Sequence, residues 1–131
     1  MKYFTIKELC KSTTAEQLGI DNSPNSEIVS NLEQLIDNIL DPLRERFGKP
    51  IYVNSGYRCP ALNKAVNGSK TSHHVKGLAA DITGGSVAKN KILFSLIQEL
   101  DLPYDQLIDE KNYSWIHVSF SLKPRKQILH L

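Results

Sequence analysis

Residues Ser72–Asp81, with the sequence SHHVKGLAAD, decide how the middle of this chain folds, because a polar turn leads directly into a short apolar run. The apolar run that follows Gly77 and continues to Ile82 is typical of a buried strand. Gly77 permits the close or left-handed backbone that a turn needs to bring His74 back toward Asp81. The stretch therefore predicts a loop followed by a strand, with one imidazole and one carboxylate near each other.

A second apolar run, WIHVS at Trp115–Ser119, carries another histidine. Alternate side chains of a strand point to opposite faces of a sheet, so His117 faces away from the helices if Ile116 and Val118 face them. Two imidazoles and one carboxylate suit a catalytic zinc ion, which takes three protein ligands and leaves its fourth position for water. Singly, each residue also fits a structural role, as a hydrogen-bonded histidine in a strand or an aspartate that forms a cap or turn.

The remaining pattern predicts helices around a small sheet. Apolar residues recur every three or four positions from Glu27 to Phe47, which predicts a long amphipathic helix that Pro42 kinks or breaks and Gly48 ends. Further predicted elements are short helices at 13–19 and 60–68, a helix at 87–100, and strands at 51–53, 104–109 and 115–121, the last two joined by a turn around 111–113. The sum is an α+β fold, with helices packed on one face of a small antiparallel sheet.

Composition sets limits on domain number and partners. The chain has 131 residues, 40% of them hydrophobic, and a net charge of +2, which predicts one globular domain over residues 1–131, expected to be a monomer. The charge is too small to indicate nucleic-acid binding, and the basic cluster Lys123–Lys126 is more simply explained as a solvated tail. Cys10 and Cys59 are too few for a disulfide framework and are expected to be free thiols in a reducing compartment, although one bridge between them stays open.

Neither a targeting segment nor a membrane span is evident. The first residues, MKYFTIKE, lack the apolar run of a signal peptide, and no stretch approaches the roughly 18 apolar residues of a spanning helix. We therefore expect synthesis in the cytoplasm without membrane insertion. A substrate outside the cell would then require release of the protein by other means.

Several motifs together carry a family resemblance: Ser55-Gly56-Tyr57-Arg58, Asn63, the Ser72–Asp81 stretch, and Trp115 with His117. Together they resemble the zinc D-alanyl-D-alanine peptidases and L-alanyl-D-glutamate endopeptidases of the M15 type, whose fold and metal triad the hedgehog domains share. The resemblance covers residues 25–121 and implies that His74, Asp81 and His117 bind one Zn²⁺ ion. Compact wall-lytic enzymes of phages and prophages, made without signal peptides, are similar in organisation.

The resemblance also indicates where the general base should be, and here the chain departs from the pattern. Many members place a carboxylate three residues before the final histidine, where this chain has Ser114, which cannot act as a base. We assign the base to Glu110, because a hairpin can return it beside His117, whereas strand alternation sends Asp109 to the opposite face. The alternative for Glu110 is a solvated charge at the hairpin.

Two residues are predicted to bind substrate. Arg58 can hold a carboxylate or a developing oxyanion through two parallel hydrogen bonds, and Ser72 corresponds to a motif serine that contacts substrate or orients the site. Their alternatives are an ordinary surface arginine and a turn former. His73 does not match a motif position and is expected to contact solvent or a metal ligand.

The sequence thus predicts a zinc metallopeptidase that hydrolyses an amide bond in peptidoglycan stem peptides, as a carboxypeptidase or as an endopeptidase. The alternative is a non-catalytic binding module of the same fold, stabilised by its metal, which the change at Ser114 leaves open. The bond that is cleaved depends on loop shape, which the motifs do not determine.

Overall fold

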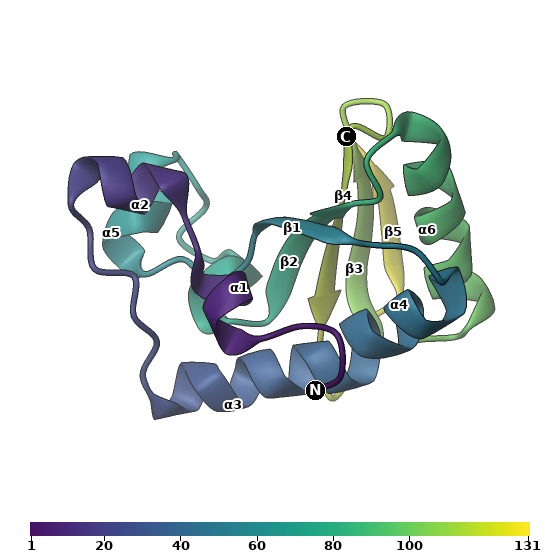
Figure 1. Ribbon diagram of the computed structural model, residues 1–131, viewed down its shortest axis with the longest axis horizontal. Coiled ribbons are helices and arrows are strands. Elements are labelled where there is room, and N and C mark those ends of the chain that lie inside the picture. The colour runs from purple at the N-terminus through teal and green to yellow at the C-terminus, as the bar shows by residue number, and fades with distance from the viewer.

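The computed structural model describes residues 1–131 and places helices around one five-stranded sheet (Figure 1). The strand order is β1-β2-β4-β3-β5, and every neighbouring pair is antiparallel except β3 and β5. The strands are β1 (Tyr52–Ser55), β2 (Ala79–Thr83), β3 (Tyr104–Glu110), β4 (Trp115–Phe120) and β5 (Gln127–His130). The α+β prediction is confirmed, with a sheet that is mixed where we expected it to be antiparallel.

The mixed pairing arises from β5, a strand that the sequence did not reveal. β5 runs parallel to β3, from Gln106 opposite Gln127 to Asp109 opposite His130. The segment 121–126 carries the chain from β4 past the end of β3, a shift of two strand spacings, or about 10 Å, which a short connection can span. The basic cluster Lys123–Lys126, predicted as a solvated tail, is therefore part of a connection between two strands.

The long helix forms as predicted, but with a local change in geometry. It comprises α3 (Ser26–Leu35), a π-helical turn η1 (Ile36–Leu40) and α4 (Asp41–Phe47), and ends at Gly48 with φ of 72°. Pro42 has no N–H to donate, and the wider turn directly before it includes a bond from the Asp41 N–H to the Ile36 carbonyl. The predicted kink at Pro42 thus takes the form of a π-helical turn.

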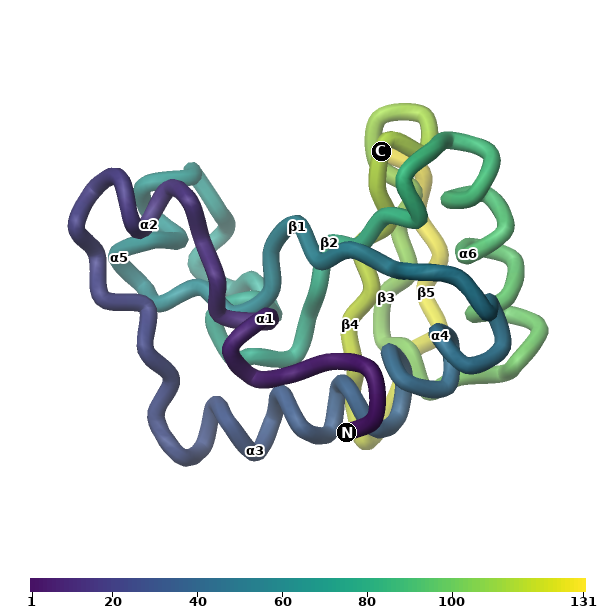
Figure 2. The backbone as a smooth tube through the Cα atoms, viewed as in Figure 1, coloured from purple at the N-terminus to yellow at the C-terminus, as the bar shows by residue number.

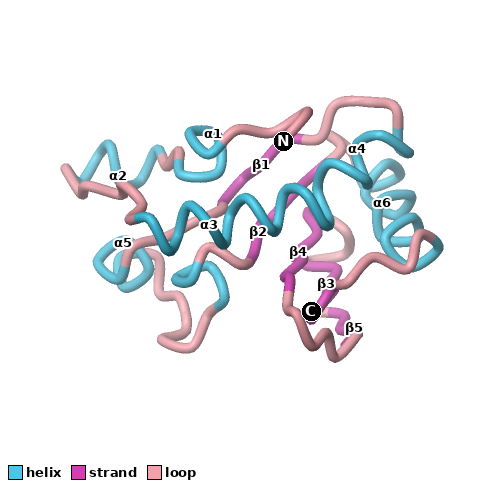
Figure 3. Tube along the Cα trace, turned by 90° about the horizontal axis from the view of Figure 1, so that it is seen from below, coloured by secondary structure: helices cyan, strands magenta, loops and turns pink.

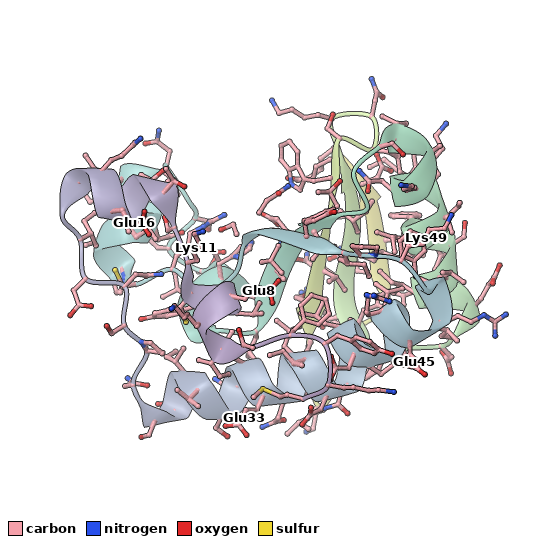
Figure 4. The ribbon with its side chains drawn as sticks, viewed as in Figure 1. Glu8, Lys11, Glu16, Glu33, Glu45 and Lys49 are labelled. Atoms are coloured by element: carbon pink, nitrogen blue, oxygen red, sulfur yellow. The ribbon has the colours of Figure 1, made fainter.

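Helices cover one face of the sheet and leave the other face for polar side chains. α3, η1 and α4 run beneath the strands, with α6 (Val87–Glu99) at one side (Figure 3). Ala80, Ile82, Ile116 and Val118 belong to the buried core that these helices share. Exposed charges such as Glu33 and Glu45 lie on the outer side of the long helix (Figure 4). His117 therefore faces away from the helices, as the alternation predicted.

Four short helices complete the chain: α1 (Ile6–Cys10), α2 (Thr13–Leu18), α5 (Pro60–Ala65) and η2 (His73–Lys76). α2 and α5 lie at the end of the molecule away from α6 (Figure 2). Cys10 and Cys59 are both free, and burial raises the pKa of the Cys10 thiol to about 11. None of the helices combines the length and the apolar character needed to cross a membrane.

Candidate metal site

Three potential ligands from separate segments meet on the open face of the sheet. His74 comes from η2, Asp81 from the middle of β2, and His117 from β4, where it is the cross-strand partner of Asp81. The Oδ1 atom of Asp81 lies 3.2 Å from Nε2 of His74 and 2.9 Å from Nδ1 of His117. All three ligand atoms lie within 4.8 Å of one another. The predicted triad is therefore assembled in space.

The geometry and chemistry of this group fit a zinc ion. At metal–ligand distances of about 2.0–2.2 Å, the ligand atoms of a tetrahedral site stand roughly 3.3–3.6 Å apart, close to the two separations above. Nδ1 of His74 lies 2.7 Å from the carbonyl oxygen of Gly56. A proton on Nδ1 leaves the lone pair of Nε2 directed toward Asp81, the tautomer that a metal ligand needs.

Asp81 is held in its ionised form. Burial raises the pKa of Asp81, but its close contacts with the His117 and His74 rings outweigh burial and hold that pKa well below its usual value. The Nη2 atom of Arg58 adds a positive charge 3.5 Å from Oδ2 of Asp81. A carboxylate must be deprotonated to bind a metal, so the site presents Asp81 in the required state at neutral pH.

The backbone of the Ser55–Arg58 segment supports His74, and its close packing requires a glycine at position 56. A Cβ atom at Gly56 would lie 2.2 Å from the backbone oxygen of Leu9, so only glycine fits at this close approach. The Gly56 carbonyl contacts Nδ1 of His74, and the Arg58 N–H donates to the His74 carbonyl at 3.1 Å. The backbone of this segment therefore holds His74 at two points.

The guanidinium of Arg58 is itself tied to protein groups. Its Nε donates to Ser55 Oγ at 3.0 Å, and its Nη1 donates to Asn63 Oδ1 at 3.3 Å. Asn63 is buried and also donates to the Ser69 carbonyl at 2.9 Å, which anchors the loop before η2. With Nη2 facing Asp81, all three nitrogens have a neighbour in the protein, so Arg58 braces the triad. Its role in substrate binding stays a prediction.

All six predicted site residues line one pocket of about 500 Å³. Ser72 contributes to it and also caps η2, because its Oγ accepts from the His74 N–H at 3.2 Å. The single apolar side chain among the lining residues is Ile108. The full lining is Arg58, Ser69, Thr71, Ser72, His73, His74, Asp81, Gln106, Ile108, Glu110, His117 and Arg125.

The hairpin places Glu110 on the same face as His117. Ile108 is the partner of His117, and Glu110 lies two residues farther along β3, opposite Trp115. Asp109 faces the other side, where it hydrogen-bonds His130. Ser114 does not enter the pocket, since its Oγ donates to the Lys111 carbonyl at 2.6 Å within the turn.

Sequence reasoning missed a buried residue that positions this hairpin. Asn90 on α6 donates to the carbonyls of Tyr113 and Ser114 at 2.8 and 3.2 Å, and accepts from the Gly84 N–H at 2.7 Å. Its exposure is 1%. A polar side chain on the buried side of an amphipathic helix was the available signal. Within the same hairpin, Nε1 of Trp115 is buried without a hydrogen-bond partner.

Comparison with known families shows to which of them this chain belongs. The family described as Peptidase M15 matches residues 2–119. The chain belongs to the peptidase M15 family. M15 peptidases are metal-dependent, which agrees with a His74–Asp81–His117 group able to hold a metal. A comparison with curated proteins gave no match. The family match begins well before the motif-based resemblance and includes α1 and α2, but it ends before β5.

Proposed function

We propose that this M15 peptidase is a zinc enzyme that hydrolyses an amide bond in the stem peptides of bacterial peptidoglycan. The convergence of His74, Asp81 and His117 in one polar pocket carries the proposal. The donor set of two imidazoles and one carboxylate favours Zn²⁺ as the metal, and an ionised Asp81 and a His74 protonated on Nδ1 are in the states that metal ligands need. The choice of stem peptides rests on the family and on the motifs that resemble its wall-degrading members.

The roles of the surrounding residues follow from their positions. A zinc ion held by the three ligands would polarise the scissile carbonyl and lower the pKa of a water toward about 7. Glu110, on the same face as His117, accepts the proton of the attacking water and donates it to the leaving amine. Ser72 and Arg58 line the pocket and contact the substrate, with Arg58 also bracing Asp81.

Metal analysis and muropeptide digestion test this function together. Protein purified without chelators should contain one zinc ion per chain, and Asp81→Ala should contain none. Mass spectrometry of purified muropeptides after incubation should show fragments from one cleaved amide bond with the unmutated protein alone, and the masses identify that bond. Absence of stoichiometric zinc would contradict the proposal. Zinc without cleavage of any muropeptide would instead favour a non-catalytic binding module stabilised by its metal.

A further inference from the structure

A second arginine reaches the pocket from the connection between β4 and β5. Arg125 binds the carboxylate of Asp105 in a bidentate manner, with Nε 3.0 Å from Oδ1 and Nη2 2.8 Å from Oδ2. The Arg125 N–H also donates to Oδ1 of Asp105 at 3.1 Å. Asp105 is 4% exposed, whereas the Arg125 side chain is 57% exposed. A buried carboxylate therefore fixes an exposed guanidinium at the rim of the pocket.

This arrangement leaves Arg125 able to bind a further anion. Nε and Nη2 face Asp105, and Nη1 makes no hydrogen bond within the protein. Arg58 differs, because protein groups lie against all three of its nitrogens. A guanidinium presents five N–H donors in a rigid plane, so Arg125 keeps free donors while its orientation is already set.

Arg125 marks the end of the pocket away from Glu110. Asp105 precedes Ile108, the partner of His117, by three residues on β3, whereas Glu110 follows Ile108 by two. A strand rises by about 3.3 Å per residue, so Asp105 lies up to about 10 Å from the metal group along the strand. Gln106 and His73 also line this end, and the carboxylate nearest to it, that of Asp105, is already bound by Arg125 and lies 3.5 Å from Nε2 of His73. An extended peptide spans the same distance in about three residues.

We propose that Arg125, fixed by Asp105, binds a carboxylate of the substrate about three residues from the cleaved bond. The inference rests on the proposed peptidase function and adds a specificity residue to it. Arg125 lies in the C-terminal segment, beyond residues 2–119 matched by the family. The ligand class is an acidic peptide, and in a stem peptide cleaved between its two terminal D-alanines the α-carboxylate of D-glutamate stands at this distance.

Two synthetic stem pentapeptides test the inference, one with this carboxylate free and one with it amidated. The zinc-loaded protein should cleave the free form with a KM about tenfold lower and a similar kcat, because a remote charge–charge contact contributes mainly to binding. Arg125→Gln should abolish this preference. Lys123→Gln removes an equal charge from the same segment, but outside the pocket. This variant should keep the preference for the peptide with the free carboxylate.

The ratio of the KM values for the two peptides separates an effect of the substitution on binding from an effect on folding. Arg125→Gln leaves Asp105 buried without its partner and can lower the amount of folded protein, but both peptides meet the same folded molecules. The double variant Asp105→Asn with Arg125→Gln removes both charges and should also show no preference. Equal KM values with the unmutated protein, or a preference that survives in Arg125→Gln, would overturn the inference and leave the peptidase function intact. Cleavage of neither peptide would overturn the proposed function and this inference with it.

Discussion

Two histidine–aspartate groups lie on opposite faces of the same sheet, and only one of them is built to hold a metal. On the open face, His74 and His117 converge on Asp81 from different segments, inside a pocket. On the other face, His130 pairs with Asp109 alone, and its side chain is 65% exposed. The same residue types therefore serve two purposes, and a third converging ligand distinguishes them. The His130–Asp109 pair fastens β5 to β3.

Removing one histidine from each group should give the largest difference between the two groups, seen in zinc binding. His117→Ala deletes a ligand, so zinc affinity should fall by more than the roughly 10–100-fold loss that follows removal of an outer hydrogen-bond partner. His130→Ala should leave zinc stoichiometry unchanged and lower the free energy of unfolding by about 1–3 kcal/mol, because Asp109 is 6% exposed and loses its partner. Metal analysis after dialysis and equilibrium denaturation measure both effects. Loss of zinc from His130→Ala would remove the distinction between the two groups.

Two adjacent carboxylates on β3 test whether the two faces of the sheet also differ in catalysis. Glu110→Gln should lower kcat by about 10²–10⁴-fold with zinc retained, because the proton acceptor is lost while the ligands stay. Asp109→Asn, one residue earlier but on the opposite face, should leave kcat within a few-fold of the original. Muropeptide hydrolysis rates at saturating substrate give the answer. Full activity of Glu110→Gln would assign the base elsewhere.

The backbone support of His74 makes the metal group sensitive to a change outside its ligands. Gly56→Ala places a methyl group against the Leu9 backbone and should reduce stability by about 1–3 kcal/mol. It should also lower zinc affinity by about 10–100-fold, because the Gly56 carbonyl orients His74. Gly19→Ala meets no neighbouring atom and should leave zinc affinity unchanged, although its φ of 67° introduces backbone strain. Equal zinc affinity in both variants would exclude this support.

The Asp105–Arg125 pair should produce the smallest effect, seen in the pH dependence of stability. Hydrogen bonds from Arg125 hold the pKa of Asp105 below its usual value. The stabilisation is therefore fully present above the unfolded-state pKa of about 3.9 and is lost as the pH falls through the lower folded-state pKa. Because the Arg125 side chain is 57% exposed, solvent screens its charge and limits this stabilisation to about 1 kcal/mol or less. Urea denaturation of metal-free protein should show a shallower loss below pH 4 for Asp105→Asn than for the original chain.

Local patterns were sufficient to predict much of the fold. The three- and four-residue spacing from Glu27 to Phe47 specified the long helix, and the alternation in β4 specified the face on which His117 lies. Both patterns arise because one face of the helix or strand is buried against a neighbouring layer, and such burial gives apolar residues a regular spacing in the sequence. The convergence of the metal group followed once β2 and β4 were correctly placed as strands.

The elements that the sequence did not reveal depend on contacts between distant segments. β5 is mostly exposed and shows no apolar alternation, so its existence rests on the edge of β3 and on the Asp105–Arg125 contact. Asn90 similarly acquires its role only when α6 meets the hairpin turn. Such hydrogen bonds join residues far apart in the chain and leave no periodic signal.

The position of β5 has a consequence for the solubility of the folded chain. Strand β3 is buried on much of its length, and without a neighbour its outer edge would offer unpaired N–H and C=O groups to another molecule. β5 occupies that edge and replaces it with a strand of four residues that begins with Gln127 and ends with His130. A short strand with polar ends is a poor template for further pairing. The final segment thus protects the sheet from edge-to-edge aggregation.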